Sequence, residues 1–274
     1  MLLDFFQYEF LTRALLAGVL IGFLAPLVGL FLVVRRFSLL ADTLSHVSLL
    51  GVAVALFFKL PLFLGALLGS LLGGMGMEWL RRSGRVMNEA VLALFLSGSL
   101  AAALVFLASV QGVNLSLFSY LFGSITTVSS IDLWWLLVLV LVIVLFMVVA
   151  YRKLFLIALD EDLAKVDGVS VDWYNFLFIL LASLVVAAAF PIVGVLLIGA
   201  LMIVPVLTAM QWRLSFRQTM ILAVMLAELS VVSGFILSYQ FSLPSGATIV
   251  LAAIGFFILS FIWNSYILPY IRVK

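Results

Sequence analysis

The sequence predicts an all-α membrane protein, a polytopic bundle of about eight or nine transmembrane helices. Of its 274 residues, 67% are hydrophobic and only 9% are charged, whereas globular domains average about 45–50% and 25%. So few charged side chains cannot cover the surface of a soluble protein of this length. The apolar residues also fall into runs of about 20, the length that a helix needs to cross a bilayer core of about 30 Å. The absence of cysteine excludes disulfides, thiolate metal sites and cysteine nucleophiles.

Short polar segments separate the apolar runs, and residues 1–274 form a single transmembrane domain on this pattern. The expected spans are residues 10–34, 38–58, 61–80, 88–108, 133–151, 173–190, 192–211, 218–239 and 247–268. The number is eight or nine because Pro191 and Pro205 interrupt an apolar region that forms one span, two spans or a partly re-entrant segment. Small residues at four-residue spacing predict close helix packing. They are Gly18 and Gly22, and Gly65, Gly69 and Gly73.

Basic residues predict the orientation of the bundle. Twelve of the 14 Lys and Arg residues fall on one side of an alternating nine-span arrangement, and we expect that side to be cytoplasmic. They are Arg35, Arg36, Arg81, Arg82, Arg85, Arg152, Lys153, Lys165, Arg213, Arg217, Arg272 and Lys274. Only Arg13 and Lys59 fall on the other side. This arrangement places the C-terminus inside the cell and the N-terminus outside.

Three ionisable residues lie inside the expected spans, where charge is costly and usually functional: Asp42, His46 and Glu228. His46 is ten residues beyond Arg36 at the expected cytoplasmic boundary, about 15 Å along a helix and therefore near the bilayer midplane. Asp42 and His46 are four residues apart, so their side chains share one helix face. A carboxylate and an imidazole in this arrangement suit Zn²⁺, Mn²⁺ or Fe²⁺. Because two ligands are too few for tight binding, we expect a twofold dimer to bring two such pairs together.

Other interpretations of these residues stay open. Asp42 and His46 also fit a hydrogen-bonded pair that only stabilises helix packing, or a proton relay without a metal. Glu228, with Ser230 and Ser233 nearby, either lines the same pathway or is protonated and paired with a hydroxyl group on a neighbouring helix. Glu78, close to the end of its span, is expected at the membrane interface.

The segment 152–172 is the one substantial polar stretch on the expected cytoplasmic side. Asp160 is expected to cap a short helix, and Gly168 is placed to end it. Leu159, Leu163 and Val166 form an apolar stripe on this helix. A helix this short is marginal in water. The stripe therefore predicts either docking into a groove on a partner protein or a helix that lies on its own membrane domain.

Several motifs are absent from the sequence. It has no G-x-x-x-x-G-K-[ST] motif, so the chain does not bind ATP through a P-loop, and any nucleotide energy has to come from another subunit. One histidine is too few for a His-Glu-x-x-His zinc protease. An intramembrane hydrolase built from Ser97 or Ser99 with His46 has no supporting motif.

A set of motifs along nearly the whole chain resembles the integral membrane permeases of metal-uptake ABC importers, the zinc, manganese and iron type. Val34–His46 and Ser48–Ala53 resemble the family's Arg-Arg-Met-Ser, Gly-Asp-x-Leu-x-His and Gly-Val-Ala stretch. Further matches are Tyr120–Gly123, Asp162–Gly168, Val193–Leu197, Ile203–Pro205 with Thr208 and Ala209, and Leu243–Gly246. The chain departs from the pattern at Ala41, where relatives commonly carry glycine, and at Ser124 and Ser242, where they commonly carry acidic residues.

The resemblance implies a homodimeric or two-permease core in the cell membrane, a separate cytoplasmic ATPase that binds the ATP, and an external solute-binding protein that delivers the metal. It also implies that Asp42 and His46 lie on the translocation path. Four residues would belong to the helix that couples to the ATPase: Asp160, Leu163, Val166 and Gly168. The chain would then be a transport subunit rather than an enzyme, with no permanently bound cofactor.

The resemblance also indicates the cargo. The inner loop and the Asp-Thr-Leu-x-His sequence are closest to the zinc-uptake members, so imported Zn²⁺ is the expected cargo, with Mn²⁺ or Fe²⁺ as the alternatives. From a different class, a proton-coupled secondary carrier would use Asp42, His46 and Glu228 as a relay and would need no ATPase.

Overall fold

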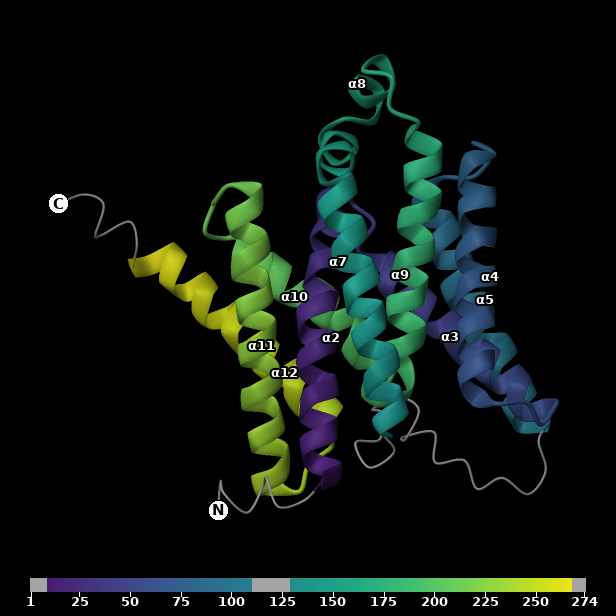
Figure 1. Ribbon diagram of the computed structural model, residues 1–274, viewed down its shortest axis with the longest axis vertical. Helices are drawn as coiled ribbons and strands as arrows, with labels where there is room; N and C mark the ends of the chain where they lie inside the picture. The colour runs from purple at the N-terminus through teal and green to yellow at the C-terminus, as the bar shows by residue number, and fades with distance from the viewer. Residues whose placement is uncertain (1–8, 110–128, 268–274) are drawn as a thin grey trace.

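The chain folds into a bundle of long helices in the computed structural model, which describes residues 9–109 and 129–267 (Figure 1). The helices are α2 (Glu9–Val34), α3 (Leu39–Phe57), α4 (Leu62–Arg82), α5 (Asn88–Ser109), α7 (Ser130–Leu159), α8 (Glu161–Val166), α9 (Val171–Val193), α10 (Val195–Met210), α11 (Phe216–Phe241) and α12 (Ser245–Ile262). A π-helical turn, Trp263–Ile267, follows α12. The described ranges contain helices and no strands, which confirms the predicted all-α class.

Among the described residues, eight helices are long and apolar enough to cross a membrane. The ninth apolar helix, α10, has 16 residues and is about 24 Å long, shorter than a bilayer core of about 30 Å. Each of the nine expected spans therefore corresponds to a helix. The apolar region around Pro191 and Pro205 forms two helices rather than one.

The break between α9 and α10 lies at Gly194, and the expectation of a helix end at Pro191 was wrong. α9 continues through Pro191 to Val193, and Gly194 has a φ of 81°, a left-handed value that glycine adopts without steric cost. Proline removes one backbone hydrogen bond, which a helix survives. Pro205 likewise lies inside α10 without ending it.

α7 is longer than the expected span 133–151. It has 30 residues, about 45 Å of helix, and so extends past a bilayer core of about 30 Å. Its first turn is held by a capping box, in which the Ser129 side chain accepts a hydrogen bond from the Asp132 N–H and the Asp132 carboxylate accepts one from the Ser129 N–H. Residues 152–159 were expected in a cytoplasmic loop but form the last turns of α7. The connection between α7 and α9 therefore begins at Asp160 and contains α8.

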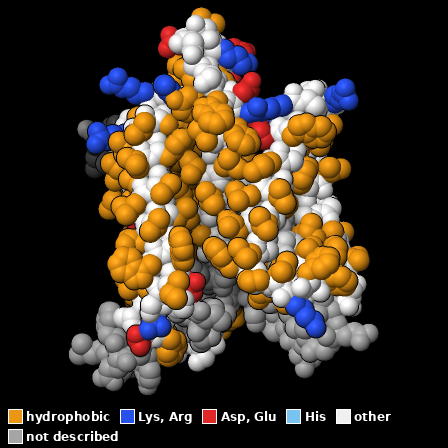
Figure 2. Space-filling model, turned by 45° about the vertical axis from the view of Figure 1, so that its right-hand side comes forward, with side chains coloured by type: hydrophobic (Ala, Val, Ile, Leu, Met, Phe, Trp, Pro, Cys, Tyr) orange, Lys and Arg blue, Asp and Glu red, His pale blue; other side chains and the backbone are white. Residues whose placement is uncertain are grey.

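Most basic residues gather at one end of the bundle. The connections 35–38, 83–87 and 211–215 lie at the end that carries α8 (Figure 1), and Figure 2 shows Lys and Arg side chains concentrated there, above sides covered with apolar side chains. We call this the basic end. It holds, in or beside its connections, Arg35, Arg36, Arg81, Arg82, Arg85, Arg152, Lys153, Lys165, Arg213 and Arg217. Arg272 and Lys274, also expected on this side, lie outside the described residues.

Glycines bring α3 and α4 into backbone contact. A Cβ atom at Gly51 of α3 would lie 2.0 Å from the carbonyl oxygen of Gly65 of α4, and one at Gly69 would lie 2.8 Å from the Cα of Gly51. A Cβ at Gly73 would lie 2.2 Å from the Cγ1 of Val47. The predicted close packing of this glycine series is confirmed, and it fixes α3 against α4.

α2 packs against α10 and α11 in a similar way. A Cβ at Gly29 would lie 1.8 Å from the carbonyl oxygen of Met202 in α10. At Gly18 and Gly22 the nearest atoms belong to the Val231 side chain of α11, at 3.1 Å in both cases, so this predicted contact is present but less close.

We expect Gly51→Ala to lower the free energy of unfolding by about 1–3 kcal/mol, because the added methyl group overlaps the Gly65 backbone. Thermal unfolding of the purified protein in detergent measures this change. Gly98→Ala is the matched control, since a Cβ at Gly98 of α5 has no atom within 4 Å. Equal unfolding temperatures for the two variants would contradict the close α3–α4 contact.

Candidate functional site

Asp42 and His46 lie in the first two turns of α3, and both side chains are half-buried. The helix begins at Leu39, one residue after the expected start of the span at residue 38, and His46 is about 10 Å along its axis. The expected depth of His46 below a boundary at Arg36 stays a prediction. Four-residue spacing on one regular helix places both side chains on the same face. The structure therefore brings the predicted pair together near the start of a well-packed helix.

The Asp42 carboxylate lies against the backbone of α10 at Gly199. A Cβ atom at position 199 would lie 1.8 Å from the Oδ1 of Asp42 and 2.9 Å from its Cγ. Only glycine leaves room for the carboxylate in this orientation. Sequence reasoning missed Gly199, because a single glycine in an apolar helix does not reveal which side chain it faces.

His46 presents a buried imidazole nitrogen, Nδ1, that makes no hydrogen bond within the described part of the chain. Buried polar side-chain atoms are nearly always paired, so this nitrogen requires an explanation. No hydrogen bond joins His46 to Asp42 among the described contacts, so a hydrogen-bonded packing pair lacks its defining interaction. A neutral imidazole nitrogen and a carboxylate oxygen on one helix face are suitable ligands for a borderline divalent cation.

Glu228 does not join this pair. It is half-buried on α11, and its Oε1 lies 3.5 Å from the position of a Cβ at Gly22, so it faces α2. The hydroxyl groups of Ser230 and Ser233 donate to carbonyl oxygens of their own helix, at Leu226 and Leu229. In residues 9–109 and 129–267, no group of three or more His, Asp or Glu residues comes together to hold a metal ion. Among these residue types, the described part of the chain thus offers Asp42 and His46 as a pair without a third partner.

The short helix α8 has the local structure expected from the sequence. The Asp160 carboxylate accepts hydrogen bonds from the backbone N–H groups of Asp162 and Leu163, at 2.8 and 3.1 Å, and Gly168 follows the helix with a φ of 77°. α8 stands beyond the ends of α7 and α9 (Figure 1). Leu163 and Val166 are 60% and 87% exposed. The apolar side chains of Leu163 and Val166 are thus open to a partner, while Ala164 of the same helix is buried against α7 and α9.

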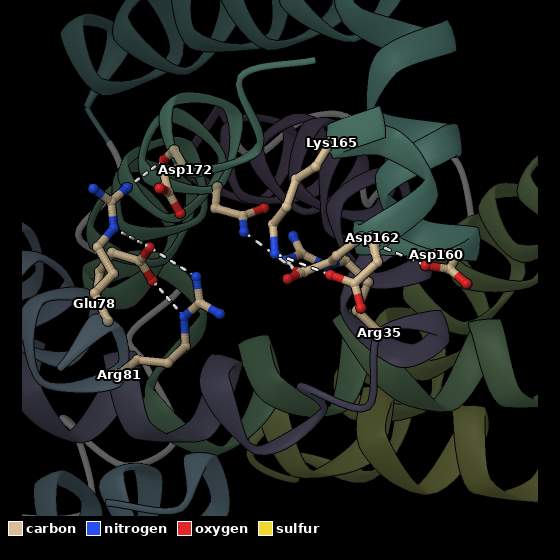
Figure 3. Close-up of polar contacts among 10 residues, drawn as sticks. Arg35, Glu78, Arg81, Asp160, Asp162, Lys165 and Asp172 are labelled. Atoms are coloured by element: carbon tan, nitrogen blue, oxygen red, sulfur yellow. Dashed lines mark hydrogen bonds and ion pairs between the residues drawn. The ribbon is translucent and has the colours of Figure 1, made fainter. Parts of the chain in front are cut away.

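A buried ion cluster lies at the basic end, where Figure 3 shows it between α4 and α9. Glu78 accepts hydrogen bonds from Arg81 at 2.7 and 2.8 Å and from Arg82 at 2.8 Å. Its side chain is 2% exposed, because the two arginines cover it; Glu78 lies in the last two turns of α4, and its expected position at the membrane interface stays a prediction. Arg82 also donates to the backbone carbonyl of Asp172 at the start of α9. The cluster thereby ties α4 to α9.

A second ion pair at the basic end joins Arg35, in the corner between α2 and α3, to Glu161 of α8. The Arg35 Nη2 lies 2.6 Å from the Glu161 Oε1 (Figure 3). Burial lowers the pKa of the Arg35 guanidinium, and the nearby Glu161 carboxylate opposes that shift. From the sequence, Arg35 was predicted only to lie on the cytoplasmic side, as one of the basic residues that indicate the orientation of the bundle.

The serine residues considered for hydrolysis are not arranged for it. The hydroxyl of Ser99 donates to the carbonyl oxygen of Leu96 in its own helix, and Ser97 is exposed. No hydrogen bond links either serine to His46 in the part of the chain that the structure describes. The Ser–His pair that such an enzyme requires is therefore not formed there.

Comparison with known sequences gives matches over most of the chain. The profile of the family described as "ABC 3 transport family" matches residues 7–264. A "Probable metal transport system membrane protein" of Treponema pallidum is 35% identical over 248 residues, which cover 90% of this chain and 93% of that protein. A "Manganese transport system membrane protein MntC" of Halalkalibacterium halodurans is 30% identical, covering 94% and 88%. A "High-affinity zinc uptake system membrane protein ZnuB" of Haemophilus influenzae is 26% identical, covering 93% and 97%.

Comparison with solved structures supports the same architecture. A structure described as "PsaBC from Streptococcus pneumoniae in complex with Fab" has a TM-score of 0.84 at 30% identity, covering 99% of this chain and 98% of that one. A second, "An inward-facing conformation of a putative metal-chelate type ABC transporter", has a TM-score of 0.71 at 20% identity, covering 92% and 85%. The second comparison shows a shared fold alone. The predicted motif at Tyr120–Gly123, and Ser124 after it, lie outside the described residues.

We expect Gly199→Ala to weaken binding of a divalent metal by about 10- to 100-fold, the usual effect of disturbing how a ligand is oriented. The added methyl group displaces the flexible end of Asp42 and leaves the backbone of α10 in place. Isothermal titration of the purified protein with Zn²⁺ or Mn²⁺ measures the change. Gly255→Ala in α12, where a Cβ would meet no atom within 4 Å, is the control. Unchanged affinity in a folded Gly199→Ala protein would show that the carboxylate position is irrelevant to binding.

Proposed function

Because the chain belongs to the ABC 3 transport family and is homologous to membrane proteins of metal transport systems, we propose that it is a permease that passes divalent transition-metal ions through Asp42 and His46. The observation that carries this proposal is the half-buried carboxylate–imidazole pair on α3. Its Nδ1 has no partner in the described chain, and its carboxylate sits in a space that Gly199 provides.

The pair supplies what a divalent ion needs inside a membrane. A bare ion in hydrocarbon costs on the order of tens of kcal/mol, so ligands have to replace its water. The same ligands have to release it again, which requires weak or incomplete coordination. One carboxylate and one imidazole per chain meet both requirements. Two chains around a twofold axis near α3 would complete a four-ligand site of two oxygens and two nitrogens.

The cargo is a divalent transition metal, zinc by the sequence with manganese or iron as the alternatives, and relatives of this chain are named for the first two. The Asp-Thr-Leu-x-His sequence predicts zinc, but relatives named for manganese and for zinc both match this chain along most of its length. Imidazole and carboxylate ligands serve both ions, so the pair itself does not separate them. Growth of a strain lacking its own importers, with zinc or manganese as the limiting metal, distinguishes the two.

The permease works with two partners on opposite sides of the cell membrane. A separate ATPase binds at the basic end, which faces the cytoplasm together with the C-terminus, and a solute-binding protein delivers the metal at the other end. The exposed Leu163 and Val166 of α8 support the first contact, because apolar side chains beyond the membrane-spanning segments favour a protein partner. Enrichment of Lys and Arg at the basic end supports the orientation.

We expect Asp42→Ala and His46→Ala each to reduce metal uptake by at least about tenfold, because each removes one of the two ligands. Uptake of radioactive zinc or manganese into cells, normalised to the permease present in the membrane, measures this loss. Glu228→Gln is the matched control for an intramembrane acidic residue, and we expect it to transport like the wild type, since Glu228 faces α2. Normal uptake by both alanine variants would refute the assignment. Uptake driven by a pH gradient into vesicles that contain the permease alone would favour a secondary carrier instead.

We expect Leu163→Asp to prevent co-purification of the ATPase while metal binding stays unchanged, because a charge replaces an exposed apolar contact on α8. Affinity purification of the tagged permease from membranes detects the partner. Met87→Asp is the control, since Met87 is 76% exposed in the connection between α4 and α5, also at the basic end. Equal recovery of the ATPase with both variants would remove the docking role of α8.

A further inference from the structure

Arg35 lies in the corner between α2 and α3, and its side chain is 7% exposed. Its guanidinium Nη2 contacts the Oε1 of Glu161, the first residue of α8, at 2.6 Å (Figure 3). The two residues are 126 positions apart in the sequence. The ion pair therefore joins the corner in front of α3 to the helix that stands furthest out at the basic end.

Glu161 and its helix α8 also contact α7 and α9. The side-chain nitrogen of Asn175 in α9 donates to the same Oε1 at 3.3 Å. Ala164 of α8 is fully buried, and it belongs to a small apolar cluster with Ile157 of α7 and Val171 of α9. α8 is thus packed on the ends of α7 and α9, and Glu161 joins it to the corner between α2 and α3.

The corner that holds Arg35 is closely hydrogen-bonded. The N–H of Phe37 donates to the carbonyl of Leu32 at 2.8 Å, and the N–H of Leu40 donates to the carbonyl of Phe37 at 2.9 Å. The guanidinium carbon of Arg35 lies 5.3 Å from the centre of the Phe37 ring, and that of Arg81 lies 5.7 Å from it. Cation–π contacts of this kind fix the ring between the two arginines. Arg35 is therefore packed into the same corner that leads into the first turn of α3, where Asp42 lies.

We infer that Arg35 and Glu161 are positioning residues that transmit movement of α8 to the Asp42–His46 pair. The inference rests on the proposed function, in which an ATPase binds α8. A buried ion pair adds little net stability compared with apolar residues of similar size, whereas loss of one partner leaves an uncompensated charge. The role of this ion pair is to link two elements, because it gives α8 a polar contact with the corner that precedes α3, the helix of Asp42 and His46. α8 can then bias the site between two arrangements.

The test uses the permease assembled with its ATPase and solute-binding protein in proteoliposomes. Metal uptake and ATP hydrolysis are measured in the same vesicles for Arg35→Gln, Glu161→Ala and the charge exchange that combines Arg35→Glu with Glu161→Arg. Arg36→Gln is the matched control, because it makes the same change of charge at the neighbouring exposed residue, which has no ion pair among the described contacts. Metal affinity and thermal unfolding are measured on the same proteins without ATP.

We expect each single variant to lose at least about tenfold in metal transported per ATP hydrolysed, a size typical of coupling between distant sites. Metal affinity and ATPase binding stay close to the wild type, while the unfolding temperature of the single variants falls because one charge loses its partner. The charge exchange restores most of the ratio, and Arg36→Gln keeps it. If Arg35→Gln does not fold, Glu161→Ala decides the outcome, because the Glu161 side chain is 36% exposed and tolerates removal better.

Three results would overturn the inference. They are an unchanged ratio in the single variants, a folded charge exchange that transports as poorly as they do, and a loss of transport that only follows a loss of metal affinity. Failure of the proposed function looks different, because the wild-type assembly would then show no ATP-dependent metal uptake at all.

Discussion

The position of the Asp42 carboxylate on α3 depends on Gly199 of α10, because a Cβ atom there would lie 1.8 Å from the Oδ1 of Asp42. On another side of the same helix, Gly51 of α3 meets Gly65 of α4 with similar closeness. α3 is therefore held by two glycine contacts, one of which touches a candidate metal ligand directly. A binding site on a rigidly packed helix keeps its ligand geometry better than a site on a loop. A larger residue at Gly51 would overlap the backbone of α4, whereas one at Gly199 would displace the Asp42 carboxylate.

Charged groups in the bundle fall into two classes. At the basic end, Glu78 is paired with two arginines, and Arg35 is paired with Glu161. Asp42 and Glu228, by contrast, have no ion-pair partner among the described residues. Paired charges compensate each other's loss of hydration, whereas an unpaired charge at half-burial remains available to a cation that passes. The paired charges at the basic end thus connect helices, whereas Asp42, which carries the proposed chemistry, is left unpaired; Glu228 is unpaired too but faces α2.

Much of the fold could be predicted from the sequence, because hydropathy and helical periodicity act within one helix at a time. The nine helices, the shared face of Asp42 and His46, and the capping of α8 by Asp160 all follow from local patterns. Contacts between distant helices could not be predicted. Gly199 and Glu161 acquire their importance from residues far away in the sequence, and no local pattern reports such a neighbour. The predicted helix end at Pro191 was wrong for another reason. The rule for proline considers one position, whereas the chain changes direction at Gly194, three residues later.

The metal-to-protein ratio at saturation tests most directly whether Asp42 and His46 form a shared site between two chains. Equilibrium dialysis of the purified permease against radioactive Zn²⁺ or Mn²⁺, with the chain concentration measured by amino-acid analysis, gives this ratio. We expect one saturably bound ion for every two chains in the wild type, and no saturable binding in the protein that lacks both ligands. One ion per chain, or saturable binding that survives removal of both side chains, would contradict the shared site.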